Sequence, residues 1–231
     1  MVNRILRRCA LVSYVLIIFF ILHVSIWTAT SPSEQKTSLL WSFAAITGAE
    51  NQRKLVAITS DSVLYSGDKF KLMFEVRQTL FVYIIFAGSG GEIVLLHPTK
   101  LDSEIQPAAI NTPVFIPNEK DWFTLDQKRG TETLYLVVSA NHLADLELLL
   151  KRYEAASLND KDEIAQTIIG LVQEKNRVIQ PLTAAVEKPI QIGGTIRSIS
   201  ERGLAEADIS KFTQSIDIED LFIRIYSIEH L

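Results

Sequence analysis

The sequence predicts a mainly β domain with α additions, and three observations lead to that class. Residues 70–76 alternate apolar and polar side chains, which is the period of a strand with one buried face. Residues 80–87 are almost continuously apolar, as in a central strand covered on both faces. After residue 139 the apolar spacing becomes helical. We therefore expect an antiparallel β-sandwich or partly open barrel of about seven or eight strands, with a helical hairpin after residue 139 and an N-terminal transmembrane helix.

The N-terminal segment predicts a membrane anchor. Residues 9–29 carry no formal charge and are long enough to cross a bilayer as a helix. The preceding residues 1–8 contain three arginines, so they form a basic tip that stays cytoplasmic. A cleaved signal peptide is the competing interpretation, but cleavage after Ala29 needs a small residue where Trp27 stands. We expect a single-pass protein of the bacterial inner membrane with its C-terminal domain periplasmic or extracellular.

Residues 30–53 are interpreted as a polar linker followed by a juxtamembrane segment. The apolar patch from Leu39 to Ile46 either packs on the domain as a short helix, which we favour, or lies in the membrane interface. The extracytoplasmic β domain then occupies residues 54–231, and its first strand is expected at residues 55–59.

Two strands in the middle of the chain are joined by glycines. Gly88, Gly90 and Gly91 supply the positive backbone angles that a hairpin turn needs before the short apolar strand at residues 93–96. The alternative is a phosphate-binding loop. No helical pattern and no GK[ST] sequence follows these glycines, so the hairpin is preferred.

Several further strands are expected later in the chain, at residues 114–116, 122–125, 134–139, 190–199 and 221–228. The proline-rich region around the first two carries Phe115, Trp122 and Phe123. These three aromatic residues are our candidate interaction or ligand surface. The alternative, which is the more frequent role of such residues, is that they cover one end of the β core.

The helical hairpin is expected at residues 142–180. Leucines recur at helical spacing from Leu143 to Tyr153, and a second apolar helical face follows. Asp160 and Glu163 fit a capping box at the start of the second helix. The simplest arrangement is an antiparallel pair packed on the sheet, and the less favoured one is a docking surface for another protein.

A family resemblance rests on turn glycines and strand hydrophobics. The residues that carry it are Tyr65 to Asp68, Phe81 to Ala87, Gly91, Glu92 and Leu95 to Pro98, with Ile116, Pro117 and Gly130 to Glu132 continuing the pattern. Over roughly residues 55–140 this pattern resembles the bacterial family DUF4384. The chain departs from the family's pattern at Gln78 to Leu80 and in the long helical segment after Ser139. The resemblance implies an extracytoplasmic or accessory β domain and no established activity.

Composition and motifs exclude several classes of function. A net charge of −4 argues against a nucleic-acid binder, because no basic face offsets phosphate repulsion. The one cysteine, Cys9, lies at the edge of the anchor, so the domain holds no disulfide. No metal-ligand spacing, nucleophile elbow or DxDxDG loop occurs. We therefore predict no catalytic residues, no metal and no cofactor, and we interpret Asp68 as a turn former and His97 as structural.

Two functions from different classes fit these observations. We prefer a non-enzymatic, membrane-anchored protein-interaction module of the bacterial envelope, whose partner is another envelope protein. The alternative is a sensor or binding domain for a small ligand or glycan, which would use the loops between Pro98 and Leu125. An enzyme ranks third, because no catalytic constellation is present in the sequence.

Overall fold

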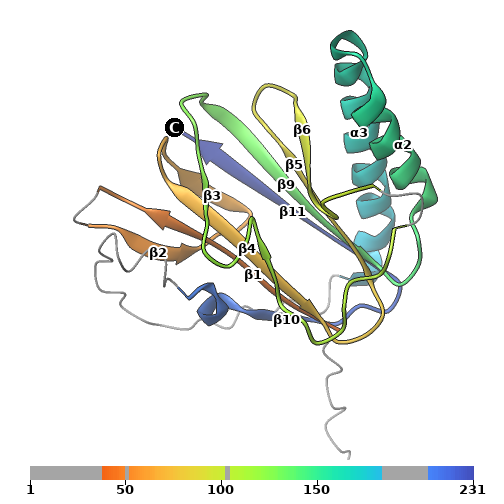
Figure 1. The fold of residues 1–231 in the computed structure, drawn as a ribbon, viewed down its shortest axis with the longest axis horizontal. Helices are drawn as coiled ribbons and strands as arrows, with labels where there is room; N and C mark the ends of the chain where they lie inside the picture. Colours follow the sequence, from red (N-terminus) through yellow and green to blue (C-terminus); the bar gives the residue numbers. More distant parts are fainter. Residues whose placement is uncertain (1–37, 50–51, 102–104, 184–207) are drawn as a thin grey trace, which may run out of the picture. The chain divides into compact units, whose positions relative to one another are not determined.

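A computed structural model describes residues 38–49, 52–101, 105–183 and 208–231. Its described part contains eleven strands, two α-helices and one short 3-10 helix. The strands form two sheets, which Figure 1 shows as two layers. The prediction of a mainly β fold with two helices after residue 139 is confirmed, whereas the expected number of strands is too low and the sheets do not close into a barrel.

The six-stranded sheet is built around two neighbouring antiparallel strands, β1 and β4. Its strands are β1 (Leu39–Thr47), β2 (Lys54–Ala57), β4 (Lys69–Val76), β7 (Val114–Ile116), β8 (Phe123–Thr124) and β10 (Gln214–Ile216). β2 and β10 pair with β1 on one side, and β7 and β8 pair with β4 on the other. Every described pairing in this sheet is antiparallel.

The five-stranded sheet has the order β3-β11-β9-β5-β6. Its strands are β3 (Asp61–Leu64), β5 (Phe81–Ala87), β6 (Ile93–His97), β9 (Gly130–Ser139) and β11 (Leu221–His230). The pairs in this sheet are antiparallel except that β3 runs parallel to β11. The glycine turn joins β5 to β6 as expected, and the Gly88 N–H donates to the Glu92 carbonyl. Gly91 has a positive φ of +89°, but Gly88 and Gly90 do not, so the prediction of positive backbone angles at those two glycines is wrong.

The main core lies between the inner faces of the two sheets. Alternation along β4 directs Phe70, Leu72 and Phe74 inward, and all three are buried. In the same core the Trp41 Nε1–H donates to the Tyr226 hydroxyl over 2.7 Å, so the indole is buried without an unsatisfied donor.

A helical hairpin covers the outer face of the five-stranded sheet. It consists of α2 (Ala144–Ala155) and α3 (Leu158–Thr183), which lie beside β5, β6 and β9 in Figure 1. Leu146 of α2 and Ile168 of α3 pack with Tyr83 and Val137 of the sheet. The Tyr83 hydroxyl also donates to Glu147, and burial raises the pKa of that tyrosine well above its usual range. The hairpin is therefore part of the fold rather than a separate arm.

The segment from Leu39 to Ile46 corrects a sequence interpretation. It forms β1 inside the six-stranded sheet, so the prediction of a short helix there is wrong. The physical reason is that Leu39, Trp41 and Phe43 face the main core, while Ala44 and Ile46 are buried on the opposite face. Because the segment is buried on both faces, its apolar and polar residues do not alternate, and the strand period is not visible in the sequence. β3 and β10 are further strands that the pattern did not indicate.

The second helix begins earlier than expected. α3 starts at Leu158, and the Ser157 hydroxyl donates to Asp160 while the Ser157 carbonyl accepts from the backbone of residues 160 and 161. Because Asp160 and Glu163 lie inside α3, the prediction that they form a capping box at its start is wrong.

Two expected elements lie outside the described residues. The anchor at residues 9–29 and the strand at residues 190–199 both fall there. None of the helices within the described ranges is long and apolar enough to span a bilayer.

Candidate functional site

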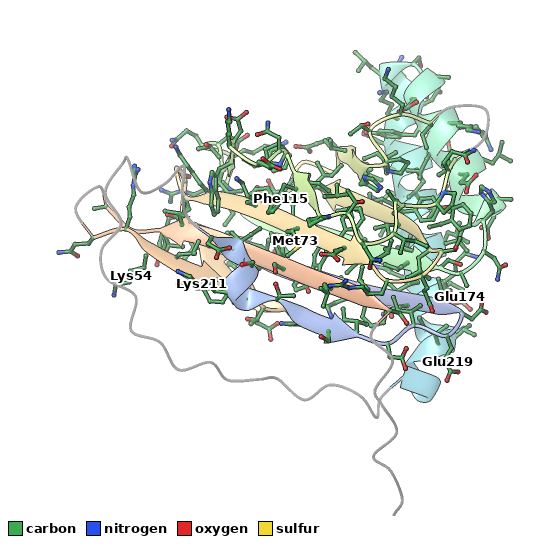
Figure 2. The ribbon with its side chains drawn as sticks, turned by 60° about the horizontal axis from the view of Figure 1, so that its bottom comes forward. Lys54, Met73, Phe115, Glu174, Lys211 and Glu219 are labelled. Carbon is green, nitrogen blue, oxygen red and sulfur yellow. The ribbon has the colours of Figure 1, made fainter. Side chains whose placement is uncertain are left out.

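The structure separates the three aromatic residues that the sequence singled out. Phe115 pairs across strands with Met73 on the outer face of the six-stranded sheet, where Trp122 also packs. Figure 2 shows Phe115 and Met73 close together on this face, near the short helix η1 (Ile209–Phe212), which carries Lys211. Phe123 packs instead against the main core. They therefore do not form one surface.

Trp122 lies under a buried lysine. The Lys71 ammonium lies 4.9 Å from the centre of the Trp122 ring and donates to the Glu119 carbonyl over 2.7 Å. Burial lowers the pKa of Lys71, although the nearby carboxylates of Asp121 and Glu119 oppose this shift. The Trp122 Nε1 is buried and has no hydrogen-bond partner among the described residues. These contacts indicate a packed lid over the sheet.

Phe123 lines a hollow of about 220 Å³ at the end of the sandwich. Its ring lies 5.1 Å from Phe70, which stacks on Phe86 at 5.8 Å. Glu92 and Lys128 line the same hollow and form an ion pair of 3.4 Å. We call this feature, with its apolar wall and charged rim, the aromatic hollow.

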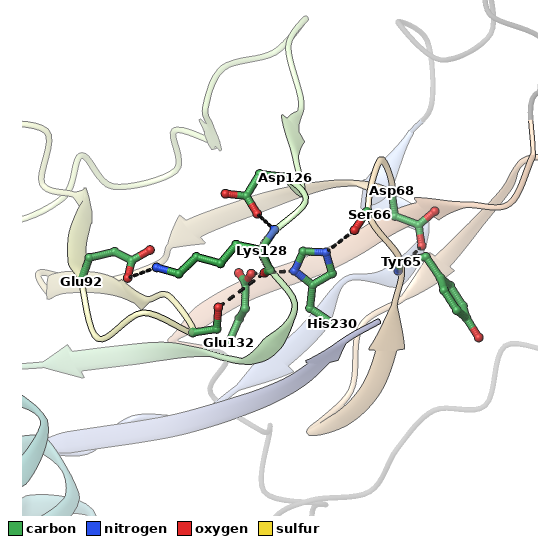
Figure 3. Close-up of polar contacts among 9 residues, drawn as sticks. Tyr65, Ser66, Asp68, Glu92, Asp126, Lys128, Glu132 and His230 are labelled. Carbon is green, nitrogen blue, oxygen red and sulfur yellow. Dashed lines mark hydrogen bonds and ion pairs between the residues drawn. The ribbon is translucent and has the colours of Figure 1, made fainter.

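A row of three hydrogen-bonded side chains lies at the same end of the molecule (Figure 3). His230 Nδ1 lies 2.9 Å from Glu132 Oε1, and His230 Nε2 lies 3.1 Å from the Ser66 hydroxyl. His230 is 1% exposed and Glu132 is 6% exposed. Burial raises the pKa of the Glu132 carboxyl, and the hydrogen bond with His230 acts in the opposite direction. We call Ser66, His230 and Glu132 the polar row.

Strand alternation explains why the polar row is buried. Glu132 has the same phase as Leu134 on β9, and His230 has the same phase as Ile228 on β11, so both point between the sheets. The register pairs Glu132 with Ile228 and Gly130 with His230, which makes the two polar residues diagonal neighbours on one face. This in-phase pattern is the signal by which the sequence could have identified both residues.

A tight turn presents Ser66 to His230. Gly67 has φ +90°, which favours glycine, and the Asp68 N–H donates to the Tyr65 carbonyl. The Asp68 carboxylate accepts from the Tyr65 N–H at 2.9 Å, as expected for an aspartate that forms a turn. The sequence interpretation of Asp68 agrees with this geometry.

The polar row has the order of a nucleophile, a base and an orienting carboxylate, but its surroundings do not support acyl transfer. The Ser66 N–H donates to the Leu231 carbonyl and the Gly67 N–H donates to the Leu125 carbonyl. These backbone donors are therefore not available to stabilise an oxyanion beside Ser66. The His230 ring is also only 1% exposed, so in this arrangement it does not reach a leaving group.

A second carboxylate lies next to the row. Asp126, which is exposed, follows β8 and lines the aromatic hollow together with Glu132. One ligand-type atom from each of Asp126, Glu132 and His230 falls within 4.8 Å of the others. Asp126 Oδ1 also accepts from the Lys128 N–H over 2.7 Å, which fixes the loop between β8 and β9. We call Asp126, Glu132 and His230 the carboxylate–histidine cluster.

The fold and site define a class of protein: a two-sheet β domain with a helical hairpin on one face and an aromatic, acidic hollow at one end. Residues 63–142 match the model of the family described as Domain of unknown function (DUF4384), so the resemblance of this segment to that family is confirmed. The match spans β3 to the start of the hairpin and includes Ser66, Asp126 and Glu132 but not His230.

No curated protein and no solved structure matches the chain.

Proposed function

We propose that this chain is a membrane-anchored, extracytoplasmic domain that acts as a non-enzymatic protein-interaction module of the bacterial envelope. One observation carries this proposal: the side chains of Val63, Tyr65 and Leu231 are exposed by 44%, 57% and 41%. Val63 and Tyr65 are two residues apart, and the Leu231 N–H donates to the carbonyl of Leu64 between them. Neighbouring exposed apolar groups of this kind are typical of interaction sites. We call them the β3 surface.

The β3 surface lies on an edge of the five-stranded sheet where, among the described residues, no further strand pairs. β3 is the terminal strand, and the carbonyls of Ser60 and Leu64 accept from the backbone N–H groups of Ser227 and Leu231. Because backbone groups alternate in direction along a strand, those of Asp61 and Val63 point away from the sheet. An extended segment of another envelope protein can therefore add to this edge and cover the exposed side chains. A hollow of about 370 Å³, lined by Arg53 and Tyr65 among others, adjoins it.

Site-specific photo-crosslinking in the native membrane tests the proposal. The full-length chain carries the crosslinking residue at Tyr65 or, as the matched control, at Val178, which is 61% exposed on α3. We expect one envelope protein to be captured at Tyr65 and not at Val178, and its capture to be lost when Val63 is replaced by lysine. The proposal fails if Tyr65 captures nothing, or if both positions capture the same proteins.

The aromatic hollow favours a second candidate function, the binding of a small ligand or glycan. Stacked rings with an ion pair at the rim suit a sugar or another small polar ring compound. A compound that occupies the hollow raises the melting temperature of the full-length chain. This rise disappears on Phe123→Ala and persists on Phe115→Ala, which lies elsewhere.

A further inference from the structure

The carboxylate–histidine cluster approaches the dimensions of a metal site. In a tetrahedral zinc site the ligand atoms are about 3.3–3.5 Å apart. Glu132 Oε1 and His230 Nδ1 are already 2.9 Å apart, and the whole set lies within 4.8 Å. The remaining adjustment falls to Asp126, whose side chain is exposed and therefore able to move.

The other nitrogen of His230 has the partner that a metal ligand needs. Histidines that bind metals through one ring nitrogen usually donate the second N–H to an oxygen, which fixes the orientation of the ring. His230 Nε2 lies 3.1 Å from Ser66 Oγ, so this position is filled and Nδ1 faces the carboxylates. The turn at Gly67 holds Ser66 there.

The two carboxylates of the cluster also favour the binding of a cation. Within the described part of the chain, Glu132 pairs with the His230 imidazole, neither Asp126 nor Glu132 pairs with a lysine or arginine, and the ammonium of Lys128 pairs with Glu92. Glu132 is nevertheless 6% exposed. A carboxylate that is withdrawn from water and lies near a second carboxylate gains from a bound cation.

We propose that Asp126, Glu132 and His230 bind a divalent cation of the zinc type. One imidazole and two carboxylates form a mixed nitrogen and oxygen set, which suits Zn²⁺. The three ligands come from the loop after β8, from β9 and from β11, so the ion ties the end of the five-stranded sheet to that loop. Asp126 and Glu132 also line the aromatic hollow, so the proposed site borders it. This proposal does not rest on the proposed interaction at β3.

Zinc titration of the full-length chain tests the site. The detergent-solubilised protein is freed of metal with a chelator, and Zn²⁺ binding is followed by competition with a chromophoric chelator. Co²⁺ absorption in the visible range reports the coordination. The informative variant is Asp126→Asn, because an exposed residue is replaced and the fold is retained. Asp162→Asn is the matched control, since Asp162 is exposed on α3 away from the cluster.

We expect one Zn²⁺ per chain, bound at least about tenfold more weakly by Asp126→Asn and with unchanged affinity by Asp162→Asn. The melting temperature of the wild-type chain rises with Zn²⁺, and the rise is smaller for Asp126→Asn. A folded wild-type chain that binds no Zn²⁺ would overturn the proposal. Equal affinity in the wild type and Asp126→Asn would do so as well, because the ion would then be held elsewhere.

Discussion

His97 shows how a single partly buried residue couples the fold to pH. Its ring lies 4.8 Å from that of Phe74 in an edge-to-face arrangement at the end of β6. Burial lowers the pKa of His97 to about 4 from a usual value of 6.5. The neutral imidazole is therefore the form that the folded protein accommodates, which agrees with the structural role expected from the sequence.

The low pKa of His97 predicts a loss of stability on acidification. The unfolded chain binds the proton near pH 6.5 and the folded chain only near pH 4, so stability is full above pH 6.5 and falls as the pH drops between these values. The expected loss from this residue is about 2–3 kcal/mol. Urea unfolding at pH 7.5 and at pH 4.5 measures it, with His97→Gln as the variant that lacks the titrating group. The wild type should lose more free energy of unfolding than His97→Gln; an equal loss would contradict the assignment.

Single residues also show which parts of the site could be predicted from the sequence and which could not. The turn role of Asp68 followed from its position after Gly67, because the hydrogen bonds involved are local. Glu132 and His230 are 98 residues apart, and only the strand register brings them together. Periodicity within each strand could have shown that both point inward, but not that they meet.

At the scale of the element, two leucines of the same helix, α2, differ in their burial against the sheet. Leu146 is fully buried against the five-stranded sheet, whereas Leu148 is 60% exposed. We expect Leu146→Ala to lower the free energy of unfolding by about 2–5 kcal/mol, because it leaves a cavity between helix and sheet. Leu148→Ala changes it by no more than about 0.5 kcal/mol. Urea denaturation of both variants measures the difference, and similar values for the two would show that α2 does not pack as described.

Most elements were predicted from their hydrophobic period or, for β5, from a short continuous apolar run, whereas β1, β3 and β10 were not predicted as strands. β4 and β11 alternate clearly, and the helices show the helical period, so their type and approximate bounds were predicted correctly. β1 is apolar on both faces, and such a run fits a helix as well as a strand. β3 and β10 are short and partly polar, so they resemble loops in the sequence.

For the molecule as a whole, the stability of the two-sheet domain depends on β1. Leu39, Trp41 and Phe43 are each at most 3% exposed, and burial of each side chain contributes about 1.5–3 kcal/mol. Their loss would remove a large part of the few kcal/mol by which a domain of this size is stable. We therefore expect a fragment of residues 38–231 to unfold cooperatively in urea and a fragment of residues 54–231 not to fold. Cooperative unfolding of both at the same urea concentration would contradict this role of β1.

The family match and the fold have different extents. Residues 63–142 supply the end of β3 and all of β4 to β9, yet β1 lies beside β4 and β11 lies between β3 and β9. The matched segment is therefore completed by strands from both flanks. The sequence could indicate the family from its turns and strands, but it could not indicate this completion, because pairing between distant strands leaves no local pattern.

The position of β11 affects how the protein is made. β11 follows all the other described strands in the sequence, and it fills the place between β3 and β9. Until the ribosome has delivered residues 221–230, the inner edge of β9 has no neighbour and the earlier strands cannot settle into a finished sheet. Contacts this far apart in sequence also form slowly. Completion of the five-stranded sheet thus waits for residues 221–230, and until then β9 presents an unpaired edge of the kind that pairs with other chains.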